Sequence, residues 1–239
     1  MIASDPSGIA LQNIALTFGE RSFQFDCMLA AGAITAITGP SGSGKSTLLN
    51  LIAGFEKPDA GEILIGGTDI TRLHPSERPV SLVFQDNNLF AHLDLFTNIG
   101  LGIHPSLKLT ATDRNRITDA LERVGLAGYE RRKPGTLSGG ERQRAAFARA
   151  LVRRKPVLLL DEPFAALDPG LRQSMTALLH DLHRETGNTV VIVTHDVDEV
   201  RRLADHALFV DHGRIALAAK IETFLTRHDI PVLADFLKA

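Results

Sequence analysis

The chain has 239 residues, of which 44% are hydrophobic and 23% charged, as is typical of a globular protein with a buried core. Its formal net charge of −2 gives no overall basic field and argues against a nucleic-acid-binding protein. The one cysteine, Cys27, excludes an internal disulfide and fits a reducing compartment, and no apolar run approaches the roughly 18 residues of a membrane-spanning helix.

The first third of the chain predicts strands around one glycine-rich loop. Alternating apolar residues at 9–18 and 23–29, with a turn at 19–20, predict two antiparallel strands. A short strand over 33–38 leads into the loop, and a helix over 47–53 follows and ends at Gly54. Further strands are predicted at 62–65 and 80–84. The loop itself reads Gly39-Pro40-Ser41-Gly42-Ser43-Gly44-Lys45-Ser46-Thr47.

This loop fits the pattern G-x-x-x-x-G-K-[ST] of a phosphate-binding P-loop. Its glycines allow a tight turn in which successive N–H groups point at one phosphate. Lys45 supplies a cation for the β- and γ-phosphates, and Ser46 supplies a hydroxyl where Mg²⁺ would bind. A Gly/Ser-rich turn is the alternative, but the flanking strand and helix favour a nucleotide site with the phosphate at a helix N-terminus.

The rest of the chain alternates helices and strands. Residues 95–126 are helical in pattern and lie between two core strands, which predicts an inserted helical subdomain. A helix over 138–154 begins at Ser138, which forms a capping box with Glu141, and ends at the basic residues 153–155, interpreted as a solvated helix end. Later come a buried strand at 157–160, a helix at 169–185, a buried strand at 189–194, a helix at 196–204, two short strands around residues 212–213 and helical pieces to 237. This order predicts an α/β fold with a mainly parallel core sheet.

Polar residues follow three of the predicted strands. Asp161 and Glu162 come directly after the buried strand 157–160, where an open α/β sheet places its ligands. Asp161 is the expected Mg²⁺-side carboxylate, and Glu162 would polarise an attacking water. Gln85 and His195 also end apolar strands and could contact Mg²⁺, water or the γ-phosphate, although each could also be an ordinary polar strand end.

A second glycine-rich segment separates the possible families. Leu137-Ser138-Gly139-Gly140-Glu141-Arg142-Gln143 alone is only a capped helix start, but together with the P-loop and residues 161–162 it resembles the signature of ABC transporter ATP-binding subunits. The resemblance extends from about residue 9 to about residue 224. A GTPase should carry an N-K-x-D motif, which this chain lacks, and neither a GTPase nor a P-loop kinase explains residues 137–143. Soluble ABC ATPases of DNA repair or translation are the other alternative within the family. They are longer chains that carry a coiled-coil insertion or two tandem ATPase domains, and this sequence shows neither feature.

The resemblance implies a set of roles. Gln85 would be the Q-loop glutamine, Asp168 would belong to the D-loop at the dimer interface, and His195 would be the switch histidine. Two subunits would face head to tail, so that Ser138, Gly139 and Gly140 of one bind the ATP held by Lys45 of the other. Mg²⁺ would be held by Ser46, Gln85 and Asp161, and Phe18 would stack on adenine unless it is a core residue at a strand end.

Residues 84–93 and 98–105 are similar to those of the ATP-binding subunits of bacterial thiamine importers. Importers of sugars, polyamines, sulfate or iron are the alternatives, but those that resemble this chain usually carry a long C-terminal regulatory domain, for which a chain ending at Ala239 leaves no room. The expectation is one ABC ATPase domain over 1–239, with the helical subdomain inserted at about 88–155. It would act at the cytoplasmic face of the bacterial inner membrane. Its expected partners are integral-membrane permease subunits and a periplasmic solute-binding protein, and it is not expected to bind nucleic acid.

A groove for a permease helix is expected within residues 86–101. It would be lined by apolar side chains, unless these fill the core of the helical insertion instead. The candidates are Leu89, Phe90, Leu93 and Phe96.

Overall fold

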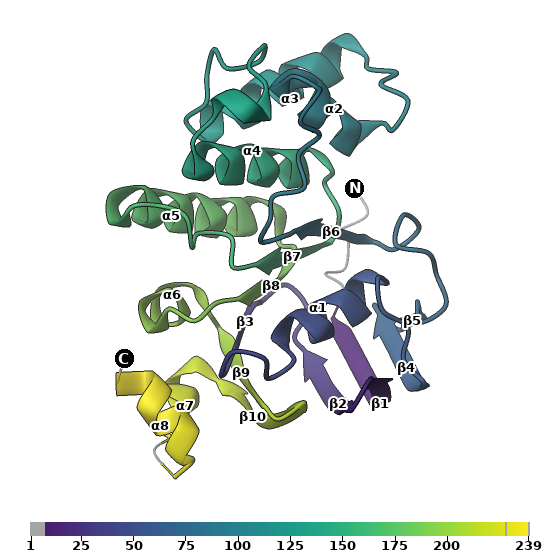
Figure 1. Cartoon of the computed structure of the whole chain (residues 1–239), viewed down its shortest axis with the longest axis vertical. Helices are drawn as coiled ribbons and strands as arrows, with labels where there is room; N and C mark the ends of the chain where they lie inside the picture. Colours follow the sequence, from purple (N-terminus) through teal and green to yellow (C-terminus); the bar gives the residue numbers. More distant parts are fainter. Residues whose placement is uncertain (1–7, 228, 239) are drawn as a thin grey trace.

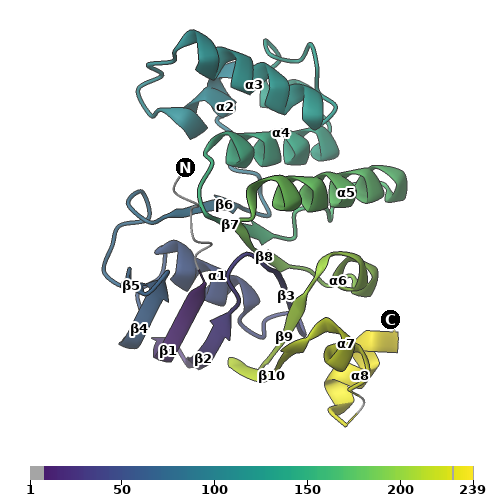
Figure 2. The same cartoon turned by 180° about the vertical axis from the view of Figure 1, so that it is seen from behind.

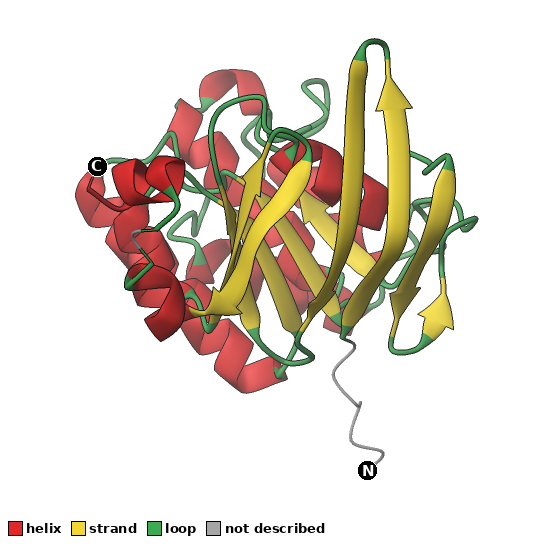
Figure 3. Cartoon of the chain, turned by 90° about the horizontal axis from the view of Figure 1, so that it is seen from below, coloured by secondary structure: helices red, strands yellow, loops and turns green. Residues whose placement is uncertain are grey.

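A computed structural model describes residues 8–227 and 229–238. Its strands form one twisted sheet of ten in the order β5-β4-β1-β2-β10-β9-β3-β8-β7-β6 (Figures 1 and 3). Strands β6, β7, β8, β3 and β9 are parallel to one another, whereas β5, β4, β1 and β2 pair antiparallel. The strands are β1 Ile9–Phe18, β2 Arg21–Leu29, β3 Ile34–Thr38, β4 Ala60–Ile65, β5 Thr68–Asp69, β6 Val80–Val83, β7 Val157–Asp161, β8 Thr189–Val193, β9 His206–Asp211 and β10 Arg214–Lys220.

The two halves of the sheet meet at β10, which runs antiparallel to β9 and pairs with β2 in parallel through Arg214 and Gln24. This arrangement confirms the predicted class, a mostly parallel sheet with antiparallel N-terminal strands. The short strand β5 has no counterpart in the prediction, because two residues are too few to show a period. The other predicted elements occur with their ends displaced by a few residues at most.

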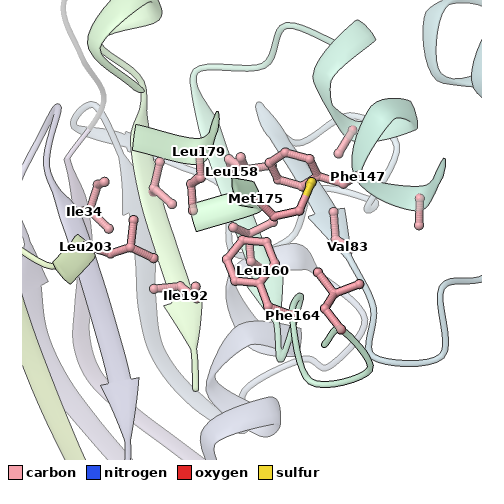
Figure 4. Close-up of a cluster of buried hydrophobic side chains, with 14 of the residues drawn as sticks. Ile34, Val83, Phe147, Leu158, Leu160, Phe164, Met175, Leu179, Ile192 and Leu203 are labelled. Carbon is pink, nitrogen blue, oxygen red and sulfur yellow. The ribbon is translucent and has the colours of Figure 1, made fainter. Parts of the chain in front are cut away.

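Alternate residues of the central strands face opposite layers of helices. Leu158 and Leu160 of β7 pack with the helices α4 (Gly139–Val152) and α5 (Pro169–Thr186), as Figure 4 shows around Phe147 and Met175. Val157 and Leu159 belong instead to the cluster of α1 (Lys45–Ala53). Helices α1 and α4 therefore cover opposite faces of the same sheet.

The helices of the insertion and those at the end of the chain lie at the two ends of the molecule (Figures 1 and 2). The helical insertion consists of α2 (Leu95–Ile103), α3 (Ala111–Arg123), the 3₁₀ turn Pro134–Thr136 and α4, and α2 and α3 pack on α4. Helices α7 (Ile221–Leu225) and α8 (Pro231–Lys238) lie near β9 and β10, and α6 (Val197–Leu203) packs on α5. Within the described residues, no helix is both long and apolar enough to cross a membrane.

Candidate functional site

The P-loop connects β3 to α1 and depends on glycine at two positions. Gly39 has φ 142°, and a Cβ there would lie 2.0 Å from the carbonyl oxygen of Val210. Gly44, the residue before α1, has φ 112°, and a Cβ there would lie 2.9 Å from the ring of Phe23. Any side chain at either position would displace the loop, so the glycines are required by close approach as well as by backbone conformation.

Lys45 lies at the centre of this loop. Its side chain is buried, and its Nζ donates hydrogen bonds of 2.8 Å to the carbonyl oxygens of Gly39 and Pro40. Burial lowers the pKa of Lys45, and the nearby carboxylates of Glu162 and Asp161 partly offset that effect. The loop thus holds a buried cation beside the N-terminus of α1, an arrangement that suits an anion such as a phosphate.

Ser46 and Asp161 meet at the carboxyl end of β7. The Asp161 carboxylate accepts a hydrogen bond from the side chain of Ser46; burial raises the pKa of Asp161, and this bond partly opposes the rise. A hydroxyl and a carboxylate are oxygen ligands of the kind that Mg²⁺ prefers. No cluster of three or more His, Cys, Asp or Glu side chains able to hold a metal occurs in the described part of the chain. The oxygens of Ser46 and Asp161 fit an ion that is bound through one or two protein ligands and the phosphates of a nucleotide.

Glu162 and His195 also come together here. The Glu162 carboxylate lies 3.5 Å from His195 Nδ1, and the histidine side chain is 67% exposed. Glu162 has φ 47°, a left-handed conformation that few non-glycine residues adopt, and its N–H donates to the carbonyl oxygen of Val193. The backbone turn after β7 thus holds the Glu162 side chain at the edge of the sheet, beside His195, the second residue after β8.

The signature segment begins α4 as predicted. Ser138 is exposed and accepts a hydrogen bond from the Glu141 N–H, while the Glu141 carboxylate accepts one from the Ser138 N–H. Gly140 packs closely on the next loop, since a Cβ there would lie 3.1 Å from Leu167. No hydrogen bond or ion pair between described residues joins Ser138 to the P-loop, and their helices cover opposite faces of the sheet.

Gln143 is a site residue whose role the sequence did not reveal. It is 4% exposed, and its amide donates to the Glu162 carbonyl oxygen at 3.1 Å and accepts from the Ala166 N–H at 3.3 Å. It therefore ties the signature helix to the backbone on both sides of residues 163–165. The only sequence signal was its place in the signature segment, one turn after Gly139.

A second group of residues that the sequence did not indicate holds the loop around His195. Arg172 of α5 forms an ion pair of 2.7 Å with Asp196 and lies 3.8 Å from the buried Glu199. Glu199 in turn accepts a 2.6 Å hydrogen bond from the Thr194 hydroxyl. Burial raises the pKa of Glu199, an effect that this bond opposes. These contacts fix the backbone on both sides of His195.

The remaining predicted site residues are Gln85, Phe18 and Asp168. Gln85 follows β6, is exposed and makes no hydrogen bond with another described residue. Phe18 ends β1 and is 67% exposed, so it is not a core residue. Its register partner is Arg21, whose guanidinium group would be 3.8 Å from a Cβ at Gly42, so the turn between β1 and β2 reaches the P-loop. Asp168 caps α5 by accepting from the Leu171 N–H.

The four groove candidates differ in exposure. Phe90 is 49% exposed, whereas Leu89 and Phe96 are partly buried against the core and Leu93 is half-buried. The buried Asn98 of α2 donates to the Phe90 carbonyl oxygen and accepts from the Phe90 N–H. The alternative that these side chains fill the core of the helical insertion is therefore wrong for Phe90. It is right in part for Leu89 and Phe96, which pack against the core.

Comparison with known proteins agrees with this geometry. The family model for ABC transporters matches residues 23–165. A thiamine import ATP-binding protein of Rhizobium meliloti is 54% identical over 231 residues, 97% of each chain, and one of Chelativorans is 50% identical over 238 residues, 99% of this chain and 97% of the relative. Among solved structures, a dimeric ATP-binding cassette in a post-hydrolysis state, bound to ADP and phosphate, is 32% identical with a TM-score of 0.81, over 89% of this chain and 98% of its own.

The P-loop, Asp161 and Glu162 at the end of β7, and the helix that begins after Ser138 thus occur in one cassette fold. The chain belongs to the family of ABC transporter ATP-binding proteins.

Proposed function

We propose that this chain is the ATP-binding and ATP-hydrolysing subunit of a bacterial thiamine importer. The observation that supports the proposal is that α1, which begins at Lys45, and α4, which begins after Ser138, pack on opposite faces of the sheet, so one chain does not join its P-loop to its signature segment. Relatives that carry the name of thiamine import ATP-binding proteins match nearly the full chain at 50–54% identity, which favours thiamine over sugars, polyamines, sulfate or iron as the cargo.

In the proposed mechanism, the P-loop N–H groups and Lys45 bind the β- and γ-phosphates of ATP. Lys45 would exchange its bonds to the Gly39 and Pro40 carbonyl oxygens for bonds to phosphate. Ser46 and Asp161, with Gln85, would hold Mg²⁺, which when bound neutralises charge on the phosphates. Phe18 would stack on the adenine, since it is exposed at a turn that reaches the P-loop.

Glu162 would act on the attacking water. Its carboxylate would accept a hydrogen bond from that water, while His195, 3.5 Å away, would contact the γ-phosphate. Gln143 and the contacts among Arg172, Asp196 and Glu199 would keep these two side chains in position.

A second copy of the chain would complete the site. Ser138, Gly139 and Gly140 of one subunit would bind the γ-phosphate of ATP on the other, and Asp168 would lie at the interface between them. The solved dimeric cassette with ADP and phosphate supports this assembly. Residues 1–239 would form one ATPase domain with the helical subdomain at about 88–155. The dimer would attach to permease subunits at the cytoplasmic face of the inner membrane. A periplasmic solute-binding protein would deliver the cargo to those permease subunits from the other side.

Thiamine uptake tests the proposal. In a host that cannot synthesise thiamine, deletion of the gene should abolish uptake of labelled thiamine at low external concentration. The parent gene should restore uptake, and Glu162→Gln should not, because it removes the carboxylate that polarises water. Unchanged thiamine uptake alongside lost uptake of a sugar, polyamine, sulfate or iron would overturn the cargo and leave the ATPase in place.

A further inference from the structure

A cavity of about 670 Å³ lies at the opposite end of the parallel strands from the nucleotide residues. Ser81 and Leu158, near the starts of β6 and β7, line it, whereas Asp161 and Glu162 lie at the carboxyl end of β7. Helices α3 and α4 of the insertion supply one side, and α5 supplies the other. Its volume falls within the roughly 300–1,000 Å³ that is usual for small-molecule sites.

Part of the lining is aliphatic. Leu158, Leu179 and Leu182 contribute from β7 and α5, and Ala120 and Val152 contribute from the insertion. Leu158 and Leu179 belong to the buried core, so this surface is held by the same packing that holds the sheet (Figure 4). Such a surface suits an apolar ring or chain of a ligand.

The polar part of the lining is positive. Four cationic side chains, Arg116, Arg123, Arg154 and Lys155, accompany the two carboxylates Asp119 and Glu185, so the lining carries a formal charge of +2 in a chain whose net charge is −2. Two of the four cations form ion pairs with carboxylates. Arg116 pairs with Asp113 and Arg123 pairs with Glu185, each at 3.0 Å.

Arg154 and Lys155 are the other two cations, and neither forms an ion pair with a described residue. Arg154 follows the end of α4 in the left-handed conformation, with φ 50°. The sequence alone suggested that residues 153–155 are a solvated helix end, but the structure places the second and third of them on the cavity. They are therefore available to an anion.

Two of the lining residues each have a buried side-chain atom without a hydrogen-bond partner among the described residues. The side chain of Ser81 is 2% exposed, and its Oγ has no hydrogen-bond partner among the described residues. The buried Nε of Arg116 has none either, although Arg116 donates to the Val152 carbonyl oxygen. A buried polar atom without a hydrogen-bond partner is uncommon in a folded protein.

We propose that this cavity binds a small organic phosphate. Its apolar ring would lie on Leu158, Leu179 and Leu182, and its phosphate would bind Arg154 and Lys155. Two cations with N–H donors suit a phosphate dianion, while the aliphatic surface discriminates against inorganic phosphate. The site shares no residue with the nucleotide site, so the inference does not depend on the proposed function.

Titration calorimetry with 1-naphthyl phosphate tests the inference. The full chain is saturated with Mg²⁺ and ADP beforehand, so that the P-loop cannot take the probe. We expect saturable binding of one probe per chain. Inorganic phosphate lacks the ring and 1-naphthol lacks the charge, so each should bind about tenfold more weakly or worse.

Variants locate the binding. Arg154→Gln combined with Lys155→Gln should weaken binding about tenfold or more, whereas the matched control Arg153→Gln, at an exposed neighbour outside the cavity, should not change it. Leu182→Trp places a bulky ring on the aliphatic surface that the probe's ring would occupy and leaves the charge unchanged, so it should weaken binding about tenfold or more. This variant tests the inference separately from the double variant. The inference is overturned if the parent shows no saturable binding, if 1-naphthol binds as tightly as its phosphate, or if Leu182→Trp or the folded double variant binds like the parent.

Discussion

Replacing Gln143 with leucine should separate ATP binding from hydrolysis. The leucine keeps most of the buried volume but removes the hydrogen bonds to the Glu162 carbonyl oxygen, at 3.1 Å, and from the Ala166 N–H, at 3.3 Å. A buried backbone group left without its partner costs about 1–3 kcal/mol. Both bonds are only partly buried, so the lower value applies and the two losses total about 2 kcal/mol.

For a chain of this length, about 2 kcal/mol corresponds to a fall in melting temperature of about 4–8 °C. The effect on hydrolysis should be larger, because Glu162 is held in a left-handed conformation that the bond from Gln143 helps to fix. A displacement near 1 Å of a catalytic group can lower a rate about a hundredfold, so we expect kcat to fall by about 10- to 100-fold. KM for ATP should stay unchanged, since the P-loop helix packs on the other face of the sheet.

Thermal unfolding and steady-state ATPase kinetics measure these two effects. The matched control is Gln173→Leu, an exposed glutamine on α5 that makes no hydrogen bond with a described residue, and it should change stability by no more than about 0.5 kcal/mol. A lower melting temperature with an unchanged kcat would show that Gln143 only stabilises the fold. A melting temperature equal to that of the parent would refute the reasoning from the two hydrogen bonds.

Three further predictions concern the assembled ATPase. Glu162→Gln should bind ATP like the parent, hydrolyse it about 100-fold more slowly or worse, and elute from gel filtration as an ATP-bound dimer; hydrolysis at the parent rate would end its assignment to the attacking water. Ser138→Arg should bind ATP yet lose turnover, and mixing it with Lys45→Ala should restore about one active site per heterodimer, because each variant supplies the half that the other lacks. Failure of that complementation between two folded variants would favour a site within one chain. Phe90→Asp should keep ATPase activity and lose transport, because the side chain is 49% exposed; loss of folding would instead place Phe90 in a core.

Local patterns in the sequence were sufficient for the P-loop, the capping box of α4 and the α/β class. Each of these depends on residues adjacent in the chain, such as Ser138 with Glu141, or on a strand run such as residues 157–160. The sequence predicted Glu162 and His195 only as residues at the ends of two strands, whose carboxyl ends meet at one edge of a parallel sheet. The 3.5 Å contact between them needs the left-handed turn at Glu162, which no residue pattern announces.

Tertiary structure alone decided which face each buried residue occupies. A fully apolar run such as residues 157–160 carries no alternation, so the sequence could not show that α1 and α4 lie on opposite faces of the sheet. The same holds for Gln143, whose partners lie 19 and 23 residues further along the chain, and for the cavity beside Arg154, which forms where the helical insertion meets the core. Contacts between distant segments depend on how helices pack on the sheet, and a local sequence pattern records only the residues within one or two turns.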